Sequence, residues 1–122
     1  MVSVPGFLLR RLYVKGSLKN TPTGFEFKLM NKLGSGYAHG MAPLIVDGVD
    51  QPPSKVYFIT DGVETTFDQV SKENVFTLAM NRDITVWVDG VTLEAGDRKI
   101  GMGFAVPGLG TLNFDFTDVI EL

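Results

Sequence analysis

The sequence predicts an all-β fold, an immunoglobulin-like antiparallel β-sandwich in which residues 1–122 form one domain. Three observations support this fold: apolar residues alternate at a period of two, turn-forming clusters separate the alternating runs, and no amphipathic run reaches helical length. A chain of 122 residues is long enough for one core and too short for a second domain beside it. The spacing of runs and turns predicts roughly seven to nine strands.

Each expected element is predicted by a local pattern in the sequence. The first segment, MVSVPGFLLRRLYVKG, is too interrupted by Pro5 and Gly6 to be a signal peptide or to span a bilayer. The segment TFDQVSKEN is the one weak helical candidate, for a single turn. The glycine-rich stretch 107–110 predicts the turn of an antiparallel hairpin between the last two runs. Strands are expected where apolar residues alternate, in Phe25–Leu29, Val56–Phe58, Ile84–Val88, Ile100–Val106 and Leu112–Phe116.

The tripeptide Asp-Gly-Val occurs three times, beginning at Asp47, Asp61 and Asp89. Asp-Gly between β-branched residues is a strong hairpin signal, because a type I′ turn needs positive φ at both central positions. A calcium loop would need alternating oxygen ligands and a closing glutamate, and the flanking residues lack that pattern. The sequence therefore predicts three turns.

Composition excludes several classes of function. The net charge of -3 and the scattered eleven Lys and Arg residues provide no basic field for a nucleic acid. The chain has no cysteine, so it has no disulfide, thiolate nucleophile or cysteine-bound metal. We expect no cofactor or metal in this chain, no membrane contact and a cytoplasmic location.

The segment GYAHGMAP contains the sole histidine, His39. A multi-histidine metal site is impossible within one chain, and a loop histidine without an activating neighbour usually has no chemical role. Its glycine-flanked loop is nevertheless the most site-like segment. We predict a partner-facing or ligand-facing loop with Tyr37, His39 and Met41.

Two aromatic residues, Tyr57 and Trp87, lie on the opposite strand faces from their apolar neighbours. If both were exposed on one sheet, they could stack on a sugar. The alternative, which we favour because large aromatic residues are generally buried, is a second inner core layer.

One strand has small residues on one face, at Gly101, Gly103 and Ala105. Such a strand is weak unless a neighbour packs closely against it. That neighbour is either the second sheet of this chain or another subunit. With the high mean hydropathy of the chain, this face predicts an interface strand in an assembly.

The ordered motifs SLKN…TGFEFKL, PLIVDGV…VYFITDG and VTLEAGDRKIGM resemble the β-sandwich small-subunit family of C-glycoside deglycosidases, from about Ser17 to Val106. The resemblance implies a non-catalytic accessory subunit of a carbon–carbon lyase that acts on C-glycosides or related sugar conjugates. It also implies a larger (β/α)₈-barrel partner, which would hold a divalent metal and all catalytic residues.

Other interpretations remain open at this point. The chain could be a stand-alone carbohydrate-binding or small-ligand-binding module, or a self-assembling homo-oligomer. Small chains with this layout are also similar to sequences labelled as hydroxymethylglutaryl-CoA reductase. We give that label no mechanistic weight, because such an enzyme needs a nicotinamide site and a much larger substrate domain.

Overall fold

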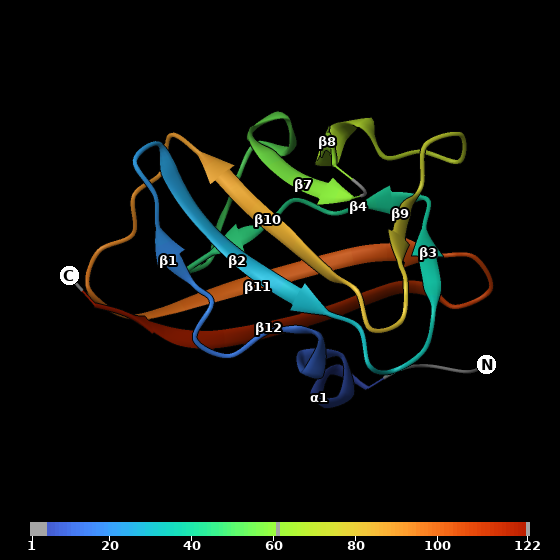
Figure 1. Ribbon diagram of the computed structural model, residues 1–122, viewed down its shortest axis with the longest axis horizontal. Coiled ribbons are helices and arrows are strands. Elements are labelled where there is room, and N and C mark those ends of the chain that lie inside the picture. Colours follow the sequence, from blue (N-terminus) through green and yellow to red (C-terminus); the bar gives the residue numbers. More distant parts are fainter. Residues whose placement is uncertain (1–4, 61, 122) are drawn as a thin grey trace.

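The computed structural model describes residues 5–60 and 62–121, and it shows two antiparallel β-sheets packed face to face (Figure 1). The first sheet has five strands in the order β1-β2-β10-β7-β8. Its strands are β1 (Lys19–Asn20), β2 (Gly24–Met30), β7 (Val56–Thr60), β8 (Val63–Thr66) and β10 (Asp83–Asp89). The predicted all-β sandwich is confirmed.

The second sheet is built on the two longest strands, which run along the whole molecule beneath the first sheet in Figure 1. Its order is β12-β11-β5-β6, and β4 also pairs with β11. A separate two-stranded sheet joins β3 to β9. The strands are β3 (Gly36–Ala38), β4 (Gly40–Met41), β5 (Ile45–Val46), β6 (Val49–Asp50), β9 (Phe76–Leu78), β11 (Gly96–Val106) and β12 (Gly110–Ile120).

The twelve strands in the described part of the chain exceed the expected seven to nine. The surplus consists of short pieces: β1, β4, β5 and β6 have two residues each, while β3 and β9 have three. Strands of two or three residues are too short for a period of two to be recognised along the sequence.

The core lies between the sheets and contains the predicted alternating residues. Phe25, Phe27 and Leu29 of β2 are buried, and the inward-facing residues of β7, β10, β11 and β12 are buried with them. The ring of Phe27 contacts that of Phe116 edge-on, with centroids 5.2 Å apart, across the two sheets. Burial of alternate residues thus fixes which face of each strand points inward.

The three Asp-Gly-Val tripeptides differ in role. Asp47 and Gly48 both have positive φ (48° and 87°) and form the two-residue turn between β5 and β6. The second tripeptide connects the paired strands β7 and β8, although Asp61 itself lies outside the described residues. At the third, Asp89 ends β10 and the chain bends at Gly90 (φ 81°), but no hairpin forms, because the next strand, β11, belongs to the other sheet.

The hairpin prediction at 107–110 is confirmed, because β11 and β12 pair from Gly96↔Ile120 to Val106↔Gly110. The weak helical candidate is also confirmed as one turn, the 3₁₀ helix η3 (Phe67–Gln69), with a capping box between Thr66 and Gln69. Another 3₁₀ turn, η2 (Pro53–Lys55), precedes β7.

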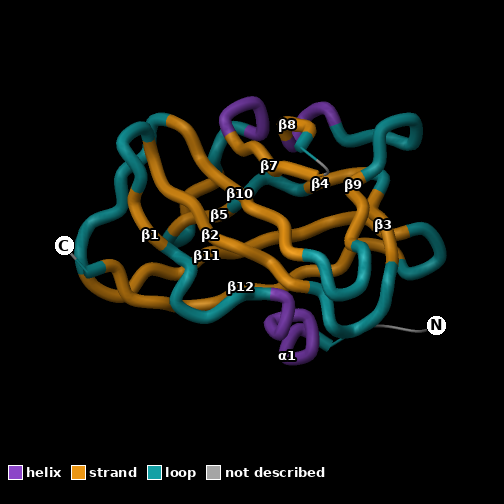
Figure 2. Tube along the Cα trace, in the orientation of Figure 1, coloured by secondary structure: helices purple, strands orange, loops and turns teal. Residues whose placement is uncertain are grey.

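An N-terminal helical segment was not predicted. It comprises α1 (Gly6–Leu9) and η1 (Arg10–Leu12), and it lies against β12 below the sheets (Figure 2). Leu9 and Leu12 are buried, which explains why this short segment is helical: a spacing of three places both residues on one face. The segment covers part of the outer edge of β12, which has no strand partner on that side among the described residues.

Candidate functional site

An apolar groove opens where the N-terminal helical segment, the segment 31–37 and the β11–β12 hairpin meet. It holds about 230 Å³, and its walls include Leu9, Leu12, Leu33, Tyr37 and Leu109. Small-molecule sites usually occupy roughly 300–1,000 Å³. The groove is therefore better matched to a single large apolar side chain than to a cofactor.

A buried asparagine shapes one wall of the groove. The side-chain Nδ2 of Asn31 donates to the carbonyls of Gly34 (2.7 Å) and Leu78 (2.8 Å), and its Oδ1 accepts from the backbone N–H of Leu33 (3.0 Å). These bonds satisfy the amide at 3% exposure. They also fix the turn that carries Leu33 to the rim.

The rim exposes several large apolar side chains. Leu33, Tyr37 and Met80 are 40%, 47% and 48% exposed, respectively. Met80 belongs to this rim because its N–H donates to Ser35 Oγ (3.0 Å), and Ser35 lines the groove. Single exposed apolar residues are ordinary, but a cluster around a groove is typical of an interaction site.

Behind the groove, the N-terminal segment is tied to β12 by a polar cluster. Tyr13 Oη donates to Asp118 Oδ2 (2.6 Å), which also accepts from Gly16 N–H (2.8 Å), and the Tyr13 ring stacks on Phe116 with centroids 3.6 Å apart. Arg10 Nε also donates to the Asp115 carbonyl (2.6 Å).

The two titratable groups of this cluster have shifted pKa values. Burial, and then the hydrogen bond to Asp118, raise the pKa of Tyr13 to about 12. Burial acts to raise the pKa of Asp118 as well, but the Tyr13 hydroxyl and two backbone N–H groups outweigh burial and hold that pKa below its usual value.

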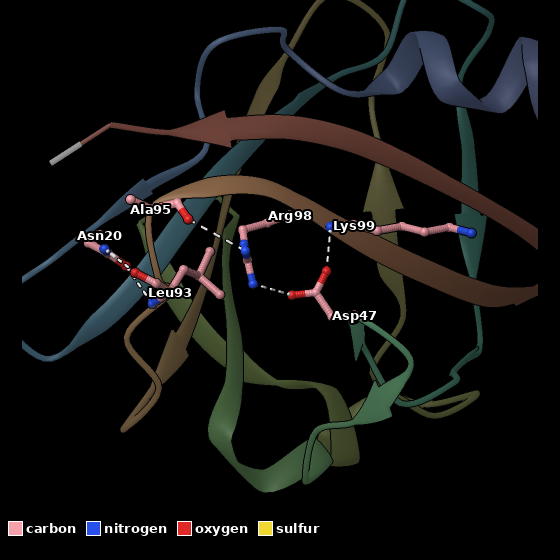
Figure 3. A network of polar contacts seen from close by, with 6 residues as sticks. All are labelled: Asn20, Asp47, Leu93, Ala95, Arg98 and Lys99. Atoms are coloured by element: carbon pink, nitrogen blue, oxygen red, sulfur yellow. Dashed lines mark hydrogen bonds and ion pairs between the residues drawn. The ribbon is translucent and has the colours of Figure 1, made fainter.

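A second polar network surrounds the first Asp-Gly turn (Figure 3). Asp47 Oδ1 accepts from the backbone N–H of Lys99 (2.9 Å), and its Oδ2 accepts from Arg98 (3.1 Å). The carboxylate thus attaches the β5–β6 hairpin to β11. This contact is structural, and it agrees with the reading of the tripeptide as a turn.

The segment with Tyr37, His39 and Met41 is not a loop. Tyr37 is in β3 and Met41 is in β4, while His39 between them donates its backbone N–H to the Ala105 carbonyl (2.9 Å). The glycines therefore allow short strand pairings with β9 and β11. Of the three residues only Tyr37 lines the groove, and Met41 packs against the core.

Tyr57 and Trp87 pair directly across β7 and β10 on the outer face of the first sheet. Their rings stack on each other, with centroids 5.1 Å apart and planes 9° apart, and both side chains are half-buried. The prediction that Tyr57 and Trp87 form a second inner core layer is therefore wrong, because the core lies on the other face of this sheet. A role in ligand stacking remains a prediction.

The small residues Gly101, Gly103 and Ala105 lie on the outer face of β11, and neighbouring strand segments cover them in part. A Cβ at Gly103 would lie 2.4 Å from Asn113 Oδ1 and 3.1 Å from the Ala42 Cβ, and one at Gly101 would lie 3.5 Å from the Ile45 Cβ. The close neighbours found are therefore side chains of the same chain. A role as an interface strand stays a prediction.

Within residues 5–60 and 62–121, no group of three or more His, Asp or Glu side chains is placed to hold a metal ion. The same residues contain no helix that is long and apolar enough to cross a bilayer.

No curated protein matches the sequence. Residues 8–121 match the family described as "Hydroxymethylglutaryl-CoA reductase, N-terminal domain". The chain belongs to this family. The match includes the helical segment from Leu8 onward, both sheets and every residue named above as lining the groove.

Membership of the reductase N-terminal domain family corrects the resemblance to C-glycoside deglycosidase small subunits, which is wrong. The predicted role as an accessory subunit of a sugar-cleaving barrel enzyme depended on that resemblance, so it is wrong as well. The motifs behind that resemblance form the β1–β2 pairing, the Asp47 turn and the start of β11. Such features occur in many antiparallel sandwiches, so they do not distinguish families.

The family description bears on partners as well. It names one domain of an enzyme, so association with a further domain or subunit is consistent with it. A barrel-type partner has no support.

Sequence reasoning missed the groove because its walls come from three distant segments. The one available signal for the helical wall was the spacing of Leu9 and Leu12, which lie three positions apart and flank two arginines.

Proposed function

We propose that this chain is a non-catalytic N-terminal domain of a hydroxymethylglutaryl-CoA reductase, and that it acts by packing against the catalytic part of that enzyme. The observation that carries the proposal is the family match over residues 8–121. The proposal includes a single folded domain and a cytoplasmic location.

The non-catalytic role is supported by the architecture. Hydride transfer from a nicotinamide needs a dinucleotide site, which parallel α/β sheets commonly provide at the carboxyl ends of their strands. All named strand pairings in the described residues are antiparallel. The groove at the end of the sandwich is apolar and narrow, which favours a contact with protein over a redox site.

The proposal is tested with the purified chain and the purified catalytic part of a hydroxymethylglutaryl-CoA reductase from the same cell. Cofactor oxidation is followed by absorbance with hydroxymethylglutaryl-CoA as the substrate. We expect no turnover by the chain alone. Mixed with the catalytic part, the chain should form a complex of defined stoichiometry in size-exclusion chromatography with light scattering, and it should raise the melting temperature of that part.

Turnover by the chain alone would contradict the non-catalytic role. Separate elution of the two proteins at concentrations well above micromolar would contradict the packing role.

A further inference from the structure

We propose that the groove between the N-terminal helical segment and residues 31–37 is the docking site of this chain, and that its occupant is a segment of the catalytic part that presents one large apolar side chain beside carboxylates. This inference rests on the proposed function and names the surface through which it operates.

The shape of the groove supports one apolar anchor. Leucine side chains from the helical segment and the β11–β12 hairpin form its walls, and Leu33, Tyr37 and Met80 stand at its rim. Interfaces commonly gain most of their affinity from one or two large side chains inserted into such a pocket, while the surrounding contacts exclude water.

The charges around the groove support an acidic partner. The segments 5–12, 31–37, 78–82 and 104–112 contain Arg10, Arg11, Lys32 and Arg82 but no carboxylate, although the whole chain has 14 acidic and 11 basic residues. Arg10 is paired with Asp115 (3.3 Å), and Arg82 also interacts within the chain. Arg11 and Lys32 are exposed, are next in sequence to the groove residues Leu12 and Leu33, and form no ion pair within the described residues. They are therefore the cations that can attract and orient an acidic segment.

Hydrogen bonds within the chain hold both walls of the groove without any partner. Asn31 fixes the wall that carries Leu33, while the contacts from Tyr13 to Asp118 and from Arg10 to Asp115 fix the helical wall. A preformed site avoids the cost in entropy of ordering its walls during binding.

A protein segment fits these features better than a lipid surface. Recognition of an anionic membrane typically uses a cluster of about four to eight Lys or Arg residues. Here two exposed cations flank an apolar centre that is recessed between walls, which suits the insertion of a side chain.

The test measures binding of the purified catalytic part to the full chain by isothermal titration calorimetry. Two groove variants are compared with wild type: Leu33→Asp, and the double charge reversal of Arg11→Glu with Lys32→Glu. Matched controls in strands that do not line the groove are Val49→Asp in β6, at a residue that is 62% exposed, and Lys19→Glu at an exposed residue of β1. Circular dichroism and melting temperature establish that every variant is folded.

We expect each groove variant to weaken binding by roughly tenfold or more, and each control to stay within about twofold of wild type. The double charge reversal should also flatten or reverse the dependence of affinity on salt, since it replaces attraction to the acidic segment with repulsion, which salt screens.

Groove variants that bind as tightly as wild type would overturn the docking site and leave the proposed function standing. Failure of wild type to bind the catalytic part would instead overturn the proposed function, and the occupant named here with it. In that case, sedimentation of wild type with phosphatidylserine vesicles, weakened in the double charge reversal, would assign the groove to a membrane surface and overturn a protein partner.

Discussion

At the scale of single residues, the Tyr13–Asp118 hydrogen bond makes stability depend on pH. The pKa of Tyr13 is raised to about 12 in the folded chain, from 10.0 for an unperturbed tyrosine. A raised pKa contributes stability that is complete below pH 10 and is lost as pH rises toward 12. The pKa of Asp118 is lowered, so its contribution is complete above about pH 4 and is lost in more acidic solution.

Tyr13→Phe should therefore lower the free energy of unfolding by roughly 1 kcal/mol at neutral pH, because the partly buried hydroxyl donates to a carboxylate and accepts from the Leu18 N–H. The difference from wild type should narrow between about pH 10 and pH 12, where only wild type loses the contribution of this phenol. Urea unfolding of both proteins, followed across that range, measures the difference.

Tyr37→Phe is a suitable control because the Tyr37 side chain lies at the open rim of the groove. A gap between Tyr13→Phe and wild type that stays constant up to pH 12 would show that the phenol is not linked to stability in this way.

At the scale of elements, Gly24 sets how closely the start of β2 can approach the end of β10. A Cβ at Gly24 would lie 1.8 Å from the backbone oxygen of Val88, so the two strands would have to separate. We expect Gly24→Ala to destabilise the chain by about 3 kcal/mol or more, since the clash is with backbone that cannot rotate away. Thermal and urea unfolding provide the measurement.

Gly36→Ala in β3 is the matched control, because a Cβ at Gly36 would meet nothing within 4 Å. It should change stability by less than about 0.5 kcal/mol. Equal destabilisation by the two substitutions would contradict the steric explanation.

The long strands could be predicted from the sequence because each buries one face. In β2, Phe25, Phe27 and Leu29 are buried while the residues between them are only partly covered, and this alternation is visible in the sequence itself. The hairpin at 107–110 was equally visible, since its glycines at 108 and 110 adopt positive φ (83° and 80°).

Other features depend on contacts that no local pattern encodes. Asp47-Gly48 and Asp89-Gly90 are the same dipeptide. Asp47-Gly48 forms the turn of a hairpin, whereas Asp89-Gly90 ends a strand, because the strand after Gly90 belongs to the other sheet. The groove depends on the meeting of segments near residues 9, 33 and 109. From the sequence, the residues of its walls could be recognised only as separate apolar residues. Among the predicted site residues, only Tyr37 lines the groove.

At the scale of the whole molecule, we propose that the two sheets unfold as one cooperative domain. Aromatic contacts link them: Phe58 meets Phe76 at 4.6 Å, and Phe76 meets Phe104 at 6.5 Å between ring centroids. Neither sheet could keep its apolar face in water if the other were lost. We expect one transition in urea, with the same midpoint by Trp87 fluorescence and by far-ultraviolet circular dichroism.

Trp87 fluorescence reports on the first sheet alone, because Trp87 is the one tryptophan of the chain and lies on the outer face of that sheet. Circular dichroism reports on both sheets. Two separated midpoints would contradict a single cooperative domain.

The contact between Tyr13 and Asp118 also has a consequence during protein synthesis. The two residues are 105 positions apart, as are Arg10 and Asp115. At about 5–20 residues per second, a ribosome makes the second partner roughly 5–20 s after the first. The helical segment emerges first and must wait for β12 before it can dock, so Leu9 and Leu12 stay accessible to chaperones throughout that interval.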